Sequence, residues 1–372
     1  MSQAMGLISC NNRSGLLRAI TRSRPMAAVP FGARYRMLDF MLSCMVNAGI
    51  RKVGIVSPYN YRPLLDHLGS GKEWSLDRKS DGLFIMPGSP EGLRVGLSHF
   101  PLRDLRQNLE FLRRGVKRDV VCSEADFIAN IDVSRLLAYH RNCDFDVTLV
   151  GKSMGSEEET WESMLHLDMT AEQGLVGWGD KKGLEHDPSM VYLGMLVIKC
   201  ELLDEIVASS PFVENMDMFE FLADNKRHIR MGVFEHTGFY RKISSIESYF
   251  RSNMDLLEPS VHTELFNTDN PILTKIKDTP PTKYRTTASV SNCLIASGCL
   301  IDGTVSGSVI SRGVRIEEGA HVRDCVIMQR SQIGKNARLE NVILDKHVIV
   351  NDNVILKGDP GEPVVIGKNA VV

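Results

Sequence analysis

A short repeat in the last quarter of the chain restricts the fold more than any other feature. After about residue 286 helical spacing disappears, and short apolar pairs recur instead. Some lie six residues apart, as Leu294 and Leu300 do, and Val342, Val348 and Val354 repeat the same step. Glycines mark the turns between the pairs, at 298, 303, 307, 313, 319 and 334. A six-residue period with three flat faces per coil predicts a left-handed parallel β-helix. An ordinary antiparallel sandwich is the alternative.

Two histidines, His321 and His347, fall within this repeat. Hexapeptide acyltransferases carry a catalytic histidine on such coils, but no acyl-carrier pocket can be argued from this sequence. We therefore interpret both as histidines that face solvent. Exposed coil faces and ends are apt to pack against other subunits, so the expected role of the repeat is assembly.

The residues before the repeat predict an α/β domain. From residue 1 to about 255, short apolar strands alternate with amphipathic helices. The expected strands cover 6–10, 52–56, 120–122, 146–150 and 193–198. Four prolines then punctuate a stretch without periodicity, which is typical of a linker. We predict an α/β domain over 1–257, a linker over 258–285 and the β-helix over 286–372.

Composition excludes several classes of protein. A length of 372 residues allows two domains with separate cores, and a net charge of −2 gives no sign of a nucleic-acid or membrane partner. No apolar run approaches the ~20 residues that span a bilayer, and no signal-peptide pattern is present. The eight cysteines form no C-x-x-C pair, which argues against zinc and disulfides. We expect a cytoplasmic protein.

The segment from Arg24 to Phe40 points to a family. It closely resembles the start of the glucose-1-phosphate adenylyltransferases (ADP-glucose pyrophosphorylases), whose motif runs R-A-K-P-A-V-P-F-G-G-K-Y-R-I-I-D-F. The match is strong after Ala28 and fails before it. The resemblance covers nearly the whole chain, and it implies a nucleotidyltransferase (Rossmann-like, GT-A-like) α/β domain followed by the left-handed β-helix.

The phosphate-binding positions of this family are changed. A nucleotidyltransferase needs backbone donors for the triphosphate, a cation on the reacting phosphate and carboxylates for Mg²⁺. The family's G-G-x-G-T-R-L loop falls on 11–17, where its three glycines are displaced and Leu16 takes the place of the arginine. Met26 takes the place of the lysine in K-P-A-V. Loss of that cation removes on the order of 3 kcal/mol of possible transition-state stabilisation.

The nucleotide and metal positions are changed as well. The family's G-T-A-D-A-V-x-Q-N segment falls on 100–108, where Phe100 and Pro101 would fill the space left for the nucleotide. Asp126 matches the first metal carboxylate. Lys242 replaces the second, and a cation at that position repels Mg²⁺.

The sugar-binding segments complete the comparison. The family's A-S-M-G-I-Y strand becomes 191–196, and Lys181 or Lys182 is the nearest candidate for the lysine of its E-K-P segment. Five losses at chemistry-bearing positions, within an intact scaffold, predict an inactive site. We expect no functional catalytic residue, no metal and no cofactor in this chain, and Mg²⁺ only in a catalytic partner.

A kept scaffold with a lost site resembles the non-catalytic, GlgD-type partner of some bacterial ADP-glucose pyrophosphorylases. The resemblance implies a regulatory subunit that joins a catalytic paralogue in a heterotetramer for glycogen biosynthesis and alters its activity or effector response. Two alternatives stay open. The first is an active adenylyltransferase with a rebuilt site, and the second is a homo-oligomeric sensor of nucleotides or sugar phosphates.

Four arginines are candidates for binding a phosphorylated effector such as AMP or a sugar phosphate. Arg24 and Arg36 match cations of the N-terminal motif, Arg34 replaces its lysine with the charge kept, and Arg315 resembles a cation of the β-helix. Arginine suits phosphate because its guanidinium donates two parallel hydrogen bonds. The alternative is that these arginines pair with neighbouring carboxylates or only hold the loop.

Overall fold

The computed structural model describes residues 3–10, 15–57, 60–89, 100–115, 117–153, 164–169, 175–179, 190–209, 216–226 and 228–372. The chain forms two compact units whose segments alternate along the sequence. Unit 1 comprises Met1–Asn12, Phe40–Lys242 and Thr268–Leu273, and unit 2 comprises Arg13–Asp39, Ile243–Asn267 and Thr274–Val372. The units therefore do not follow the predicted order of 1–257, 258–285 and 286–372, because two segments of the predicted α/β domain belong with the β-helix.

Unit 1 is built on a mixed sheet with the order β10-β9-β11-β6-β1-β4-β5, in which β8 joins β11 to β12. Four adjacent strands pair parallel with one another, namely β6 (Asp119–Glu124), β1 (Ala4–Ser9), β4 (Lys52–Ser57) and β5 (Gly82–Pro87), and β12 pairs parallel with β8. The others are β8 (Val147–Ser153), β9 (His166–Met169), β10 (Leu175–Gly179), β11 (Met190–Lys199) and β12 (Met231–Glu235). Every residue of β1, β4 and β6 is buried, as expected for parallel strands covered on both faces. The predicted strands are confirmed.

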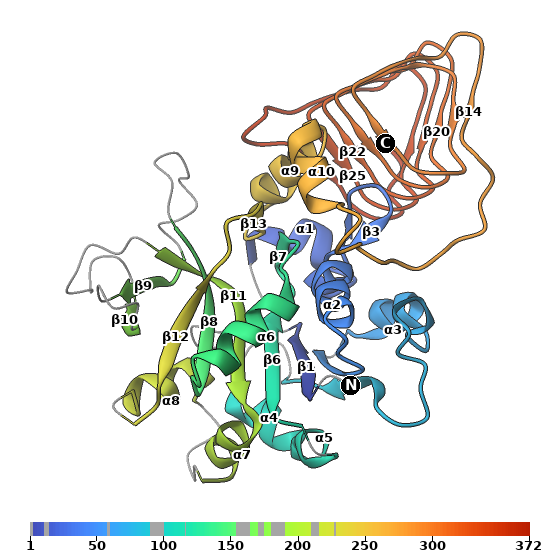
Figure 1. Ribbon diagram of the computed structural model, residues 1–372. Coiled ribbons are helices and arrows are strands. Elements are labelled where there is room, and N and C mark those ends of the chain that lie inside the picture. Colours follow the sequence, from blue (N-terminus) through green and yellow to red (C-terminus); the bar gives the residue numbers. More distant parts are fainter. Residues whose placement is uncertain are drawn as a thin grey trace. The chain divides into compact units, whose positions relative to one another are not determined.

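Helices cover this sheet (Figure 1). They are α2 (Met37–Asn47), α3 (Arg62–Leu68), η3 (Lys72–Trp74), α4 (Leu102–Gln107), α5 (Leu109–Arg113), α6 (Val133–Asn142), α7 (Cys200–Ser209) and α8 (Met218–Asp224). Residues of α4, α5, α7 and α8 share one apolar core with Val120 and Cys122 of β6. The leucines at 102, 105, 109 and 112 have the spacing of one continuous helix. They lie on two, because the chain leaves helical geometry at Asn108, whose side chain donates to the carbonyls of Asp104 and Pro87.

Unit 2 contains a left-handed parallel β-helix, whose three sheets form the sides of a triangular coil in Figure 1. The first sheet holds β14 (Lys283–Tyr284), β17 (Leu300–Ile301), β20 (Arg315–Ile316), β23 (Gln332–Ile333) and β26 (Ile349–Val350). The second holds β15 (Ser289–Ser291), β18 (Thr304–Ser306), β21 (His321–Arg323), β24 (Arg338–Glu340) and β27 (Ile355–Lys357). The third holds β16 (Leu294–Ile295), β19 (Val309–Ile310), β22 (Val326–Ile327), β25 (Val342–Leu344) and β28 (Val364–Ile366).

The register explains the turn residues of the repeat. Thr304, His321, Arg338 and Ile355 stack in register, so each of these coils takes 17 residues (321 − 304 = 17), one fewer than three hexads. The corners are tight because one residue in each takes a left-handed conformation. At one corner these residues are Asn292, Gly307, Asp324 and Asn341, with φ between 46° and 55°. Glycine and asparagine tolerate that conformation best. His321 and His347 are both exposed, as predicted.

Unit 2 also contains short elements from two other parts of the chain. These are η1 (Gly15–Leu17), α1 (Arg18–Thr21), η2 (Met26–Ala28), β2 (Pro30–Phe31), β3 (Tyr35–Arg36), α9 (Ile246–Asp255) and α10 (Pro259–Leu265). Ser245 caps α9, and its partner in the capping box is Ser248. Met254 packs with Ala33 and Val309, which ties α9 to the β-helix. The predicted linker is partly ordered structure, since it contains α10 and β14. No helix among the described residues is long and apolar enough to cross a bilayer.

Candidate functional site

Two buried carboxylates lie at the carboxyl end of β6 in unit 1. Glu124 is the last residue of the strand and Asp126 follows it. Strand β7 (Phe127–Ala129) comes next and pairs antiparallel with β13 (Tyr240–Lys242), with Lys242 opposite Phe127. This pairing brings Lys242 to the carboxylates across more than a hundred residues of sequence. Its Nζ donates to Glu124 Oε2 at 2.6 Å and to Asp126 Oδ1 at 3.0 Å.

The three side chains form a salt-bridged cluster in which Lys242 is protonated. Burial disfavours the charge on Lys242, but Asp126 and Glu124 outweigh this effect and raise the pKa of Lys242 above its ordinary value. Only 21% of the Lys242 side chain is exposed. A buried carboxylate without a partner is costly, so Lys242 supplies the positive charge that this pair requires.

This cluster does not fit a divalent cation. The Lys242 ammonium already bonds the two carboxylates that would have to coordinate the metal, and its own charge would repel it. Among the residues that the structure describes, no group of three or more His, Cys, Asp and Glu side chains could hold a metal ion.

Glu124 is the one member of the cluster that the sequence interpretation missed. An acidic residue at the end of a buried strand, two positions before Asp126, was the signal available. Strand β11 passes close to Glu124 and Phe127. Gly194 there has a φ of 86°, and a Cβ on it would lie 3.2 Å from Glu124 Oε2 and 3.0 Å from the Phe127 ring. Glycine is therefore required at this position.

Phe100, which the sequence places at the nucleotide position, lies in the apolar core of unit 1. It shares that core with Tyr192 of β11 and Phe219 of α8, whose ring centroids are 4.9 Å apart. Its backbone N–H donates to Asp217 Oδ2 at 3.2 Å, and Asp217 also caps α8. Phe100 therefore occupies packed space, and its neighbour Pro101 is half-buried.

Two further positions of the predicted site lie in unit 2. Leu16 in η1 is 71% exposed, and Met26 in η2 is buried. The first four residues of the predicted phosphate loop, 11–14, lie outside the described residues, as do Lys181 and Lys182.

The four candidate arginines differ in their surroundings within unit 2. Arg24 is buried and forms an ion pair with Asp345, so it has the carboxylate partner that the alternative interpretation required. Arg36 donates from Nη1 to the carbonyl of Ala28 at 3.2 Å. Arg34 is exposed and lies over the Tyr35 ring at 5.2 Å. Arg315 is exposed on β20, between Leu300 and Gln332 of the neighbouring coils.

Arg34 and Arg36 belong to a dense group of cations, which we call the cationic patch. Its members are Arg34, Arg36, Lys275, Lys277, Arg312, Arg330, Lys346 and Lys368. Burial, followed by Arg36 and Arg24, lowers the pKa of Lys346 to about 7. Burial and neighbouring cations, Arg36 among them, also lower the pKa of Lys277. Crowded cations of this kind favour the binding of an anion.

The sequence interpretation missed the members of the patch that the β-helix supplies, and Arg315, the β-helix arginine that it singled out, is not one of them. Arg330 is a corner residue of the coil with a φ of 60°, a conformation that usually marks glycine or asparagine. In the sequence, Arg330 lies one coil of 17 residues after Gly313, so an arginine in place of a corner glycine was the available signal for a functional position.

Comparisons with known proteins agree with this architecture. Residues 15–160 match the family described as Nucleotidyl transferase, and residues 280–362 match the family described as GlmU-like, C-terminal hexapeptide. The chain is 32% identical over 371 residues to the glycogen biosynthesis protein GlgD of Bacillus subtilis (strain 168), covering 100% of this chain and 97% of the relative. It is 29% identical over 364 residues to glucose-1-phosphate adenylyltransferases of Bacillus thuringiensis subsp. konkukian (strain 97-27) and Bacillus anthracis, covering 95% of each chain. The chain therefore belongs to the glucose-1-phosphate adenylyltransferase family, as a member of the GlgD type.

Proposed function

We propose that this chain acts in glycogen biosynthesis as a subunit without catalytic activity of its own. It joins a catalytic glucose-1-phosphate adenylyltransferase in a heterotetramer and modulates that enzyme. The catalysed reaction converts ATP and glucose 1-phosphate to ADP-glucose and pyrophosphate. The observation that carries the proposal is the bonding of Lys242 to both Glu124 and Asp126.

The chemistry of nucleotidyl transfer explains why this contact matters. Mg²⁺ neutralises the charge that develops on the phosphates, and it must itself be held by carboxylate oxygens. The Lys242 ammonium carries only one positive charge, and it donates hydrogen bonds to two carboxylate oxygens of the protein. Met26 and Leu16, which stand where the family has cations, offer no charge to replace what is lost.

The regulatory part of the proposal rests on the cationic patch. A phosphorylated effector such as AMP or a sugar phosphate would relieve the repulsion among its cations. Arg34 and Arg36 are the members that the family motif supplies, and Lys346 is a member whose pKa falls through burial and then through Arg36 and Arg24. Arg24 holds Asp345, so we assign it a structural role instead of effector binding.

The test measures pyrophosphate release from ATP and glucose 1-phosphate with Mg²⁺. The purified chain is assayed alone and then mixed with a catalytic relative from the same cell. We expect no turnover alone and an altered rate or effector response in the mixture. Turnover by the chain alone, abolished in Asp126→Ala, would establish the active-enzyme alternative. A homo-oligomer that binds ligand and ignores the catalytic relative would establish the sensor alternative.

A variant separates regulation from assembly. Arg36→Gln should weaken the effector response of the mixture and leave its rate without effector unchanged. The matched control is Arg135→Gln, which removes an exposed arginine from α6 in unit 1. An effector response that is the same in both variants would exclude Arg36 from the effector site.

A further inference from the structure

A cavity lined mainly by charged and polar residues, with apolar surface between them, lies at the amino-terminal ends of strands in the unit 1 sheet. Its volume is about 810 Å³. Strands β4 and β5 begin beside it, with Lys52 in register with Gly82. The parallel strand β6, which β1 separates from β4, ends at Glu124, at the opposite, carboxyl ends of the strands. A strand of six residues places its amino and carboxyl ends about 17 Å apart. Ligands of α/β sheets ordinarily bind at the carboxyl ends of the strands, so this cavity is distinct from the nucleotide site of the fold.

The cavity contains a buried ammonium. Lys52 lines it, although only 1% of the residue is exposed. Its Nζ donates to the carbonyl oxygens of Phe111, at 2.5 Å, and Arg114, and lies 4.5 Å from the centroid of the Phe111 ring. In the described part of the chain no acceptor is recorded for its third N–H and no carboxylate forms an ion pair with it. A buried charge is costly without a counter-charge, so this site favours an anion.

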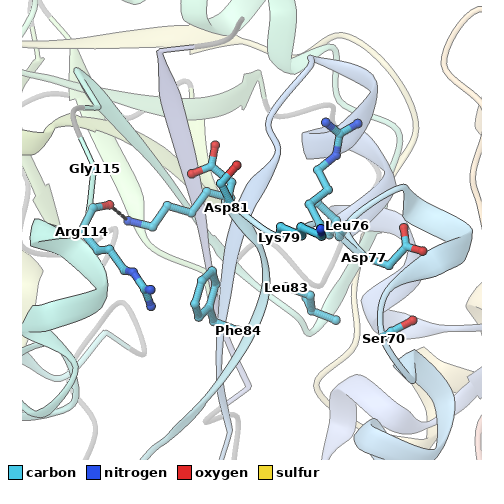
Figure 2. A pocket seen from close by; sticks show the side chains of 12 residues that line it. Ser70, Leu76, Asp77, Lys79, Asp81, Leu83, Phe84, Arg114 and Gly115 are labelled. Atoms are coloured by element: carbon cyan, nitrogen blue, oxygen red, sulfur yellow. Dashed lines mark hydrogen bonds between the residues drawn. The ribbon is translucent and has the colours of Figure 1, made fainter.

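Further cations surround the opening. Figure 2 shows Arg114 and Gly115 on one side of the cavity and Lys79 and Asp77 on the other. Arg78 also lines the opening, and its Nε donates to the carbonyl of Ser75. Within the described residues, the side chains of Lys79 and Arg114 have no recorded hydrogen bond or ion pair.

Carboxylates only partly balance these charges. Asp77 and Asp81 line the cavity, but Asp81 already pairs with Lys117 Nζ at 3.1 Å. The lining therefore presents four cations against two carboxylates, one of which is neutralised from outside. Leu83 and Phe84 are half-buried and lie between the charged sides, where they offer apolar surface.

We propose that this cavity binds a phosphorylated small molecule. Lys52 and Arg114 contact its phosphate, Arg78 and Lys79 close around it from the opposite side, and Leu83 and Phe84 contact its carbon skeleton. The site is separate from the cationic patch of unit 2 and from the Lys242 cluster.

The test uses inorganic pyrophosphate as the probe, with titration calorimetry and hydrogen exchange on the full chain. Pyrophosphate should protect the backbone amides of 70–84 and 111–115 from exchange. Arg114→Gln should weaken the binding that gives this protection about ten-fold, because one charge-assisted contact is lost. Arg135→Gln is the control and should leave it unchanged. Arg114 is exposed, so its variant should fold normally.

Two further comparisons make the result decisive. Lys52→Met should abolish the protection of 70–84, whereas Arg36→Gln in the cationic patch should leave it intact. AMP and glucose 1-phosphate, tested in parallel, distinguish a ligand with a base from one with a sugar only. Protection confined to segments of unit 2, or undiminished protection in Arg114→Gln, would overturn the proposal, whatever the outcome of the activity assay.

Discussion

Lys242 gives Glu124 and Asp126 one positive charge at one fixed point, where a catalytic member of the family would need an exchangeable metal. The difference is chemical as well as electrostatic. A bound Mg²⁺ keeps coordination positions for phosphate oxygens, whereas the Lys242 ammonium directs two of its three donors at protein carboxylates. Lys242 leaves the cluster with one net negative charge, and its hydrogen bonds occupy carboxylate oxygens that a metal would need.

Removing the ammonium should therefore destabilise unit 1. Lys242→Met leaves Glu124 and Asp126 buried without their cation, and we expect a loss of about 3–5 kcal/mol in the free energy of unfolding. The control is Lys199→Met. Lys199 also bonds two aspartates, Asp144 and Asp146, but these are more exposed, so its loss should cost less than about 1 kcal/mol. Urea unfolding of the two variants measures both values, and equal losses would contradict this interpretation of the cluster.

Lys346 predicts a pH dependence at the cationic patch. Its pKa is about 7 in the folded chain, chiefly because of burial and then because of Arg36 and Arg24, against an ordinary value of 10.5. Below pH 7 it is charged in both states, and the repulsion is fully present in the folded one. Between pH 7 and pH 10.5 the unfolded chain binds more protons, so stability rises with pH. Lys346→Met should lack this rise, and urea unfolding across that range measures it. A variant that keeps the rise would place its origin elsewhere.

At the scale of elements, the sequence predicted what depends on local periodicity. The β-helix followed from apolar residues six apart, and the corner residues Asn292 and Asp324 show why glycine and asparagine recur there. Contacts between distant segments were not predictable in the same way. The bond between Lys242 and Glu124 depends on the pairing of β13 with β7, and no local pattern specifies that pairing. The break at Asn108 was missed because side-chain bonds, not composition, divide α4 from α5.

The ion pair of Arg24 and Asp345 gives a prediction for these distant elements. It joins the segment after α1 to the residue that follows β25 in unit 2, and both side chains are 3% exposed. Arg24→Met leaves a buried carboxylate and should lower the free energy of unfolding by about 3–5 kcal/mol. Adding Asp345→Leu should recover most of that loss, because two apolar residues replace both charges. Arg323→Met is the control, because Arg323 is 59% exposed in its ion pair with Glu340, so its loss should cost less than about 1 kcal/mol. No recovery in the double variant would show that the pair does more than balance charge.

At the scale of the whole molecule, the sequence predicted an α/β domain and a β-helix, but not which segments of the chain make up each unit. Each unit gathers segments that lie far apart in the chain, and residues 13–39 and 243–267 join the β-helix. Apolar periodicity identifies a strand or a helix by the face that it buries. It does not state which core receives that face, so the boundaries of 1–257 and 286–372 reflect the local pattern alone.

The division into units predicts how two substitutions combine. Lys242→Met and Arg24→Met remove ion pairs from different units, and their side chains share no recorded partner in the described part of the chain. Their effects on the free energy of unfolding should add to within about 0.5 kcal/mol. Hydrogen exchange read by peptide locates each effect. Arg24→Met should increase exchange in 13–39 and 274–372, and Lys242→Met should do so in 119–129 and 240–242. Faster exchange in both units from either single substitution would mean that the units unfold together, and the stability of the Lys242 cluster would then depend on the β-helix as well.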